Sequence, residues 1–360
     1  MQSPGIRSGL RRSAAGCLLA AMAGTVCAAD GFPIQQREPA LQLGSQPSPA
    51  TYVPLPRAAQ RWRLCASFPH MKDAYWLAVD YGIVVQARAL GVDVDVYEAG
   101  GYLNLARSQE QIEQCVAAGA QAVLLGAIDY HALNPLIAEL RARGVPTVDL
   151  VNGVSSPDVA AKSLVSFRDM ARSIGEYLVR RYEGRPAPVR VAWFPGPKGA
   201  GWVEQGDAGL RAAFAGTPLK IVATAHGDTG FEAQAALIEE TLAAHPDIDV
   251  IVGTAVTAEV AVRLLAQRPA DAPPIEVAAY YLTPGVYRGI RSGAIVAAPT
   301  DSPVLQGRIA VDQAVRLLEG KPLQADVGPI IQVIDRITIA AYPLDAAIAP
   351  AGFRATMTVR

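Results

Sequence analysis

The sequence predicts an α/β protein of two doubly wound lobes joined by crossovers that act as a hinge. Three observations lead to this prediction. Short apolar strands alternate with helical stripes along most of the chain. The alternation restarts after about residue 165, and a chain of 360 residues has the length of about two ordinary domains. The apolar runs at 123–127 and 250–254 also resemble one another, because each is a central strand that ends in glycine.

The N-terminus predicts export. Residues 1–28 contain a basic start with three arginines, an apolar Ala-rich run over 13–26, and small residues suited to cleavage after Ala28. A lipoprotein anchor at Cys27 and twin-arginine export fit these residues less well. We therefore expect a periplasmic protein that has no membrane insertion of its own once the signal is removed, because no later apolar run approaches the length of a span.

Composition and motif spacing argue against several functions. The net charge is −1, so nothing in the charge favours nucleic acid. The four histidines are scattered without metal-ligand spacing, and the loop 196–201 lacks the pattern of a phosphate or dinucleotide site. No nucleophile–base motif is visible. We expect no metal, no cofactor and no enzymatic activity.

The first lobe follows an extended leader over 29–61 that is rich in Pro, Gln and Ser. In the strand at 92–98 valines alternate with aspartates, which is typical of an edge strand, whereas the strand at 122–125 is continuously apolar. With the strand at 63–68 between them, this pattern matches the flavodoxin-like order two-one-three-four-five. The remaining predicted elements of this lobe are a strand at 146–151, a first helix that opens over 71–77 and stops at Gly91, and helices at 108–118 and 132–143.

The second lobe repeats the alternation. Its predicted strands are at 189–194, 220–224, 249–252 and 275–280, with helices at 170–182, 204–214, 232–244 and 258–267. A final helix at 303–318 and an apolar segment at 327–334 follow.

Aromatic residues mark a candidate site at the first helix. Tyr75 and Trp76 are adjacent in its first turn, directly after a strand and a proline turn. In an open parallel sheet, ligands bind at this carboxyl end of the strands. Trp76 also lies on the apolar stripe of the helix, so core packing is the alternative for it, whereas Tyr75 lies off the stripe.

Two cysteines remain after signal cleavage, Cys65 on the first strand and Cys115 on a helix of the same lobe. An even pair in an oxidising compartment is a disulfide candidate. The alternative is two buried small apolar side chains.

The chain resembles the periplasmic binding proteins of the ribose-binding, LacI-like group, which have the type I fold. The resemblance implies a first lobe of residues 62–165 plus 302–325 and a second lobe of 166–301 plus 326–360. It rests on Lys72-Asp73-Ala74-Tyr75-Trp76, Glu98-Ala99-Gly100-Gly101-Tyr102, and the segments 111–115, 150–152, 195–197, 253–255, 286–289 and 350–354.

Within this group the motifs resemble the members that sense trimethylamine N-oxide. The resemblance implies an aromatic cage between the lobes, made of Tyr75, Trp76, Tyr102 and Tyr281. Where a tryptophan is expected, this chain has Phe167, which has no N–H to donate, so related methylated amines stay open as ligands. Asp301, at a predicted crossing, is either a ligand acceptor or the N-cap of the helix that follows.

The same resemblance implies a partner, the periplasmic sensor domain of a membrane histidine kinase. We therefore expect a sensor that closes on a small methylated amine oxide and biases the kinase. The alternative is a protein that supplies an ATP-driven sugar importer, which would have carboxylates and amides around the ligand. A LacI-type repressor is disfavoured by the export signal.

Overall fold

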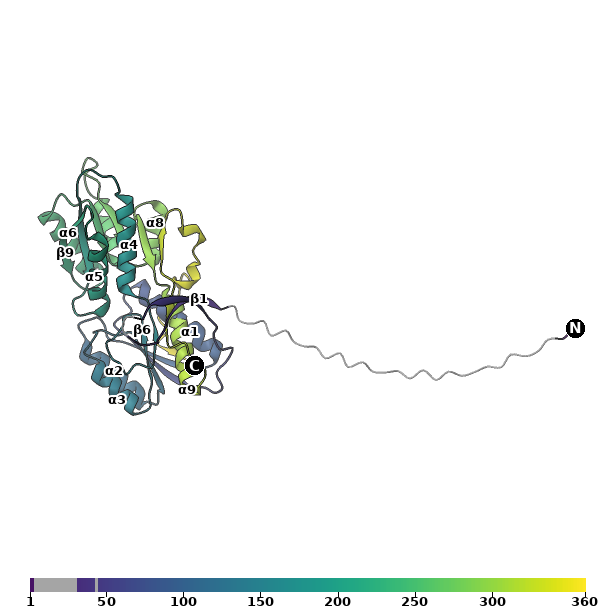
Figure 1. The fold of residues 1–360 in the computed structure, drawn as a ribbon. Helices are drawn as coiled ribbons and strands as arrows, with labels where there is room; N and C mark the ends of the chain where they lie inside the picture. The colour runs from purple at the N-terminus through teal and green to yellow at the C-terminus, as the bar shows by residue number, and fades with distance from the viewer. Residues whose placement is uncertain (3–30, 43–44) are drawn as a thin grey trace.

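The computed structural model describes residues 1–2, 31–42 and 45–360. The predicted signal peptide, apart from its first two residues, lies outside this part of the chain. Within it the chain forms two α/β lobes that lie end to end, with β1 (Phe32–Arg37) across their junction (Figure 1). Among the described residues, no helix combines the length and the apolar character needed to span a membrane.

The first lobe contains a sheet whose central strands are parallel and fully buried. Its strand order is β15-β4-β3-β5-β6-β7-β13-β1-β2, so the order two-one-three-four-five predicted for this lobe is confirmed over β4 to β7. These strands are β3 (Arg63–Phe68), β4 (Asp93–Glu98), β5 (Ala122–Leu125), β6 (Thr147–Leu150) and β7 (Ala161–Ser163).

Helices cover both faces of this sheet. Two of them, α1 and α9, pack with their backbones in close approach. A Cβ atom at Gly82 would lie 2.1 Å from the carbonyl oxygen of Val304, and one at Gly307 would lie 2.4 Å from that of Val79. Glycine at both positions therefore allows the contact, which packs the middle of α1 against the first turns of α9. The helices are α1 (Ala74–Leu90), α2 (Leu105–Ala117), α3 (Asn134–Ala142) and α9 (Pro303–Glu319).

The second lobe repeats this plan on a smaller sheet of order β11-β10-β8-β9, whose strands are all parallel. A short antiparallel pair, β12 with β14, lies beside it. The strands of this lobe are β8 (Val189–Gly196), β9 (Leu219–His226), β10 (Val250–Gly253), β11 (Glu276–Ala279), β12 (Ala297–Thr300) and β14 (Gln332–Asp335). Its helices are α4 (Phe167–Arg181), α5 (Gly201–Phe214), α6 (Phe231–Ala244), α7 (Ala255–Leu265) and α8 (Pro284–Ser292).

The chain passes between the lobes at three places before its C-terminal tail runs back from β14 to the first lobe, where β15 (Thr358–Val359) pairs with β4. It leaves the first lobe between β7 and α4, returns between β12 and α9, and leaves again between β13 (Asp326–Pro329) and β14. Ser302, at the second passage, has a φ of 51°, a left-handed conformation that is uncommon outside glycine. Three parallel connections of this kind make the hinge of a protein that opens and closes.

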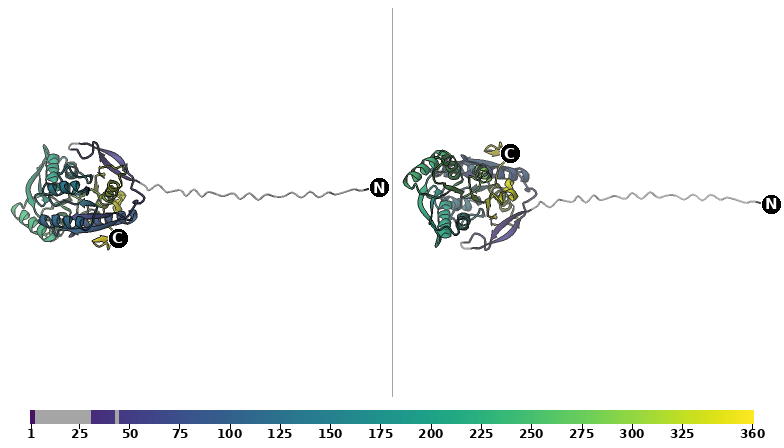
Figure 2. Two further views of the ribbon diagram at one scale, coloured as in Figure 1. Left: turned by 90° about the horizontal axis from the view of Figure 1, so that it is seen from below. Right: turned by 90° about the horizontal axis from the view of Figure 1, so that it is seen from above.

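At both ends of the chain the structure shows pairings that the sequence did not predict. The leader is extended, but β1 and β2 (Pro47–Tyr52) form a hairpin that pairs with β13 and becomes the edge of the larger sheet (Figure 2). Residues 326–360 do not all belong to the second lobe, because β13 pairs with β7 and β15 (Thr358–Val359) pairs with β4. Two short 3-10 helices, Ile339–Ala341 and Leu344–Ala346, lie between β14 and β15. The outer edge of β4 is thus covered by β15, whereas the alternating pattern of β4 predicted a strand at the edge of the sheet.

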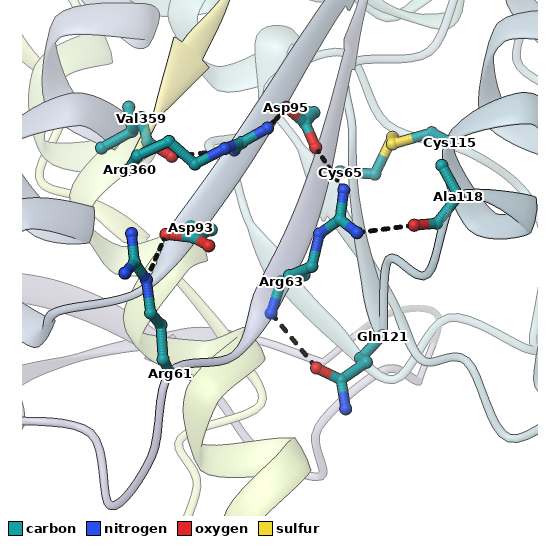
Figure 3. Close-up of polar contacts among 10 residues, drawn as sticks. All are labelled: Arg61, Arg63, Cys65, Asp93, Asp95, Cys115, Ala118, Gln121, Val359 and Arg360. Carbon is teal, nitrogen blue, oxygen red and sulfur yellow. Dashed lines mark hydrogen bonds and ion pairs between the residues drawn. A yellow bond between two sulfur atoms is a disulfide. The ribbon is translucent and has the colours of Figure 1, made fainter.

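Charged residues and a disulfide hold this edge together. Arg63 and Arg360 both contact the carboxylate of Asp95, so β3, β4 and β15 are joined by side chains as well as by their backbones (Figure 3). Cys65 and Cys115, the predicted candidates, form a disulfide with their Cα atoms 6.1 Å apart. The disulfide ties β3 to α2.

Candidate functional site

Aromatic side chains of both lobes meet around one small cavity between the lobes. The cavity volume that is open to the centre of a water-sized sphere is about 20 Å³. This volume has room for little more than one water molecule. Such a narrow cavity suits a small solute better than a sugar ring. The lining residues are His70, Asp73, Tyr75, Trp76, Tyr102, Asn152, Phe167, Trp202, Thr229 and Tyr281.

The first turn of α1 supplies the base of the cavity. Asp73 is the N-cap of this helix, and its carboxylate accepts hydrogen bonds from the backbone N–H groups of Tyr75 and Trp76 at 3.1 and 3.2 Å. The cap fixes the start of the helix, so the two adjacent aromatic rings take defined positions. Trp76 is 2% exposed and Tyr75 is 6% exposed.

The rings form two groups of edge-to-face or tilted contacts, and each group joins residues of both lobes. The centroid of Tyr75 lies 5.0 Å from that of Tyr281 and 5.9 Å from that of Trp76. Trp202 lies 6.1 Å from Tyr102 and 5.9 Å from Phe167. These separations lie within the range of favourable aromatic pairs. The predicted cage residues Tyr75, Trp76, Tyr102, Phe167 and Tyr281 are therefore neighbours in the structure.

Polar groups between the rings are few and mostly paired. Asn152 donates a hydrogen bond of 3.1 Å to the hydroxyl of Tyr102, which leaves the hydrogen of that hydroxyl for another acceptor. The ring of His70 contacts the hydroxyl of Thr229, on the second lobe, at 3.2 Å. Burial lowers the pKa of His70, so its imidazole is neutral at pH 7.

The described lining of the cavity has an acidic side chain and no lysine or arginine. The acidic side chain is that of Asp73. Burial raises the pKa of Asp73, while its hydrogen bonds to the helix N-terminus oppose that rise. A ligand with a positive end therefore meets the faces of the rings and a carboxylate, and no cation.

Asp301 is not among the residues that line the cavity, and Ser302 takes the N-cap position of α9 that was one expectation for Asp301. Contact of Asp301 with the ligand stays a prediction. It is fully buried, and it accepts hydrogen bonds from the hydroxyl of Tyr75 and from the side chain of Gln306. Ser302 is the N-cap of α9 and makes no side-chain cap bond. Burial raises the pKa of Asp301 to about 6. Its role in the structure is to orient Tyr75 from behind.

Five lining residues of the cavity were not among the predicted site residues: His70, Asp73, Asn152, Trp202 and Thr229. Trp202 had a usable signal. It lies in the first turn of α5, directly after the loop that follows β8, which is the position that Trp76 has after β3. Thr229 and His70 had none, because their contact depends on how the two lobes face each other.

Two lobes, a hinge of three connections and an enclosed aromatic site define a solute-binding protein of the hinge-closing class. The model of the periplasmic binding protein domain matches residues 66–322. The chain belongs to this family of periplasmic binding proteins, which confirms the predicted fold and location. Among the described residues, no group of three or more metal-ligating side chains lies together.

Individual relatives are similar over most of the chain. Periplasmic protein TorT of Escherichia coli strain K12 is 39% identical over 300 residues, which are 83% of this chain and 85% of that protein. An ABC transporter solute-binding protein from Bradyrhizobium sp. BTAi1, solved with bound Bis-Tris, is 48% identical with a TM-score of 0.78 and covers 91% of this chain and 98% of its own. The complex of the TorS sensor domain with TorT in the presence of TMAO matches at 31% identity and a TM-score of 0.73, over 82% and 99%.

Proposed function

We propose that this protein is a periplasmic sensor that binds trimethylamine N-oxide, or a closely related methylated amine oxide, between its lobes. The closed form then biases the periplasmic sensor domain of a TorS-like histidine kinase. The observation that carries the proposal is the meeting of aromatic rings from both lobes around one small cavity without a cation. The similarity to TorT and to its complex with TorS supports the same ligand and partner.

The chemistry of the ligand fits these rings. Trimethylamine N-oxide presents three methyl groups around a positive nitrogen and one strongly accepting oxygen. Each aromatic face over such a cation contributes about 0.5–2 kcal/mol. Micromolar binding corresponds to roughly −8 kcal/mol. The rings contribute a large part of this free energy, and burial of the methyl groups adds to it against the loss of translational freedom.

Ligand and kinase are coupled through closure. The first lobe contributes Tyr75 and Tyr102 and the second contributes Tyr281, so a ligand that touches all three favours the closed form. If the kinase domain binds one form better, then each of the two partners changes the affinity of the other by the same factor. The proposal assigns no chemical reaction to the cavity.

Isothermal calorimetry with trimethylamine N-oxide tests the proposal. We expect micromolar binding to the protein alone and a changed affinity when the sensor domain of the kinase is present. Tyr81→Ala is a matched control, because Tyr81 is on the same helix but pairs with Phe353 away from the cavity. An absence of heat in both titrations of the unmodified protein contradicts the ligand assignment.

The alternative is a protein that delivers its solute to an ABC importer, as the name of the Bradyrhizobium relative indicates for that protein. A sugar importer is disfavoured by the lining, since rings outnumber the polar groups that would bind hydroxyls. A thermal-shift screen of amine oxides, betaines and sugars separates the two. A shift with sugars alone favours the importer.

A further inference from the structure

Trp202 forms the second-lobe wall of the cavity together with Phe167. It is 3% exposed, and its ring lies between those of Phe167 and Tyr102, which come from different lobes. The side chain of Phe167 contributes an aromatic ring to this wall but has no hydrogen-bond donor. Trp202 brings both a ring and an N–H.

The surroundings of Trp202 hold its ring in one orientation. The ring stacks on Tyr280 at 6.2 Å with an interplanar angle of 27°. The hydroxyl of Tyr280 lies 3.2 Å from the carbonyl oxygen of Trp202 and 3.0 Å from that of Phe167, so it holds both residues of the wall. A Cβ atom at Gly196 would lie 2.3 Å from the indole, so only glycine leaves space for the ring there.

The indole N–H of Trp202 is a buried donor that has no hydrogen-bond partner among the described residues. It lies near enough to the hydroxyl of Tyr102 to oppose the rise in the pKa of that group, but without the geometry of a hydrogen bond. A buried donor without an acceptor is destabilising by about 1–3 kcal/mol. Such groups are rare in proteins, and one at the wall of a binding cavity indicates an acceptor on the ligand.

We propose that Trp202 determines specificity in this cavity by donating its indole N–H to the oxide oxygen of the ligand. This inference rests on the proposed function. The indole N–H of Trp202 takes the place of the donor that a tryptophan would supply at position 167, where this chain has phenylalanine. The methyl groups of the ligand then point toward Tyr75, Trp76 and Tyr281. The hydroxyl of Tyr102, whose hydrogen is free, is a second donor to the same oxygen.

The test compares Trp202→Phe with the unmodified protein, using two probes of similar size. Trimethylamine N-oxide has the accepting oxygen, whereas tetramethylammonium has a methyl group in its place. Loss of a hydrogen bond to a charged acceptor lowers affinity roughly tenfold to a hundredfold. We expect that loss for trimethylamine N-oxide and an affinity for tetramethylammonium that changes less than threefold.

Trp193→Phe is the matched control. Trp193 is a fully buried tryptophan of the same lobe, and its N–H donates to Asp207 at 3.2 Å outside the cavity. The ratio of the two affinities should stay unchanged in this variant. Equal losses for both probes in Trp202→Phe, or no loss for either, overturn the assignment of the donor while the proposed function stands. If the unmodified protein does not bind trimethylamine N-oxide, both proposals fail.

A second measurement needs no variant. In protein labelled with ¹⁵N at tryptophan, the chain gives four indole N–H signals. The signal of Trp202, assigned by its absence in Trp202→Phe or by through-space contacts to Phe167, should move downfield with trimethylamine N-oxide and not with tetramethylammonium. A signal that responds equally to both probes contradicts the hydrogen bond.

Discussion

Trp76 shows that a single residue can belong to the core and to the site at once. It lines the cavity, but its ring is also 5.0 Å from that of Phe68 and lies against Gly126, where a Cβ atom would be 2.6 Å from the ring. Trp76 is therefore a core residue that also lines the cavity, and its contact with a ligand stays a prediction. A change at this residue affects stability and the cavity together.

We predict that Trp76→Ala lowers the free energy of unfolding by about 3–5 kcal/mol, because it removes a large buried ring. The same change should remove measurable binding of trimethylamine N-oxide. Urea denaturation gives the first quantity and calorimetry well below the melting temperature gives the second. Tyr81→Ala, on the same helix, should keep the affinity. A Trp76→Ala protein that binds as tightly as the unmodified chain would falsify the cage.

Asp149 is a second residue whose surroundings make a prediction. It is fully buried at the end of β6, where one carboxylate oxygen accepts from the backbone N–H of Val154 at 3.0 Å and the other has no partner among the described residues. Burial raises its pKa to about 7, with nearby Lys162 opposing the rise and Asp326 adding to it.

We predict that Asp149→Asn becomes more stable, relative to the unmodified protein, as pH rises from about 4 to 7. The folded protein binds a proton at Asp149 in this window and the unfolded chain does not, so the contribution of Asp149 to stability falls with rising pH. The difference between the two proteins should grow by roughly 1.4 kcal/mol per pH unit and then level off. Urea denaturation at several pH values measures it. The exposed Asp271→Asn is the control, and a difference independent of pH contradicts the prediction.

At the scale of elements, the disulfide links the strand β3 to the helix α2. Both cysteines are buried and 50 residues apart in the sequence. A cross-link over a loop of this length restricts the unfolded chain considerably. It also holds α2 beside the loop that carries Tyr102, since α2 begins at Leu105.

We predict that the double variant Cys65→Ala/Cys115→Ala has a free energy of unfolding lower by about 2–4 kcal/mol. Dithiothreitol should lower the melting temperature of the unmodified protein and leave that of the double variant unchanged. Affinity for trimethylamine N-oxide should change little, since neither cysteine lines the cavity. Equal melting temperatures of the unmodified protein with and without reductant argue against a stabilising disulfide.

At the scale of the whole molecule, contacts between the lobes close the cavity. Lys72 on the first lobe pairs with Asp228 on the second at 2.9 Å, and both side chains are partly exposed. The adjacent contact of His70 with Thr229 lies deeper, at the lining itself. These contacts exist only when the lobes are together, so they favour the closed form without stabilising either lobe.

We predict that Lys72→Gln weakens ligand affinity about twofold to fivefold and leaves the unfolding of each lobe unchanged. An exposed ion pair contributes about 0.2–1 kcal/mol, and salt screens it. Calorimetry at low and high salt should show that the difference in ligand affinity between Lys72→Gln and the unmodified protein becomes smaller as the salt concentration increases. Arg172→Gln breaks a similar ion pair within α4 and should not alter affinity. Loss of affinity in both variants would mean that the effect does not come from closure.

Several features of the site were predictable because their signals are local. Tyr75 and Trp76 follow a strand and open a helix, and Tyr102 and Tyr281 follow strand ends, so the sequence places them at the carboxyl edges of two sheets. Asp301 has the same kind of position but points behind the cavity toward Tyr75. The position of a residue at a strand end thus predicts its neighbourhood but not the direction of its side chain.

The sequence alone determined most of the alternation of strands and helices, the order of the central strands of the first lobe and the buried character of the strand at 122–125. These depend on periodicities within a few residues, which a single chain displays directly. The tertiary structure decided that Trp202 faces Phe167 and Tyr102, that the leader and the last strand complete the first sheet, and that His70 meets Thr229. Such contacts join residues tens to hundreds of positions apart, so they depend on how whole lobes pack and close, and no local pattern records that.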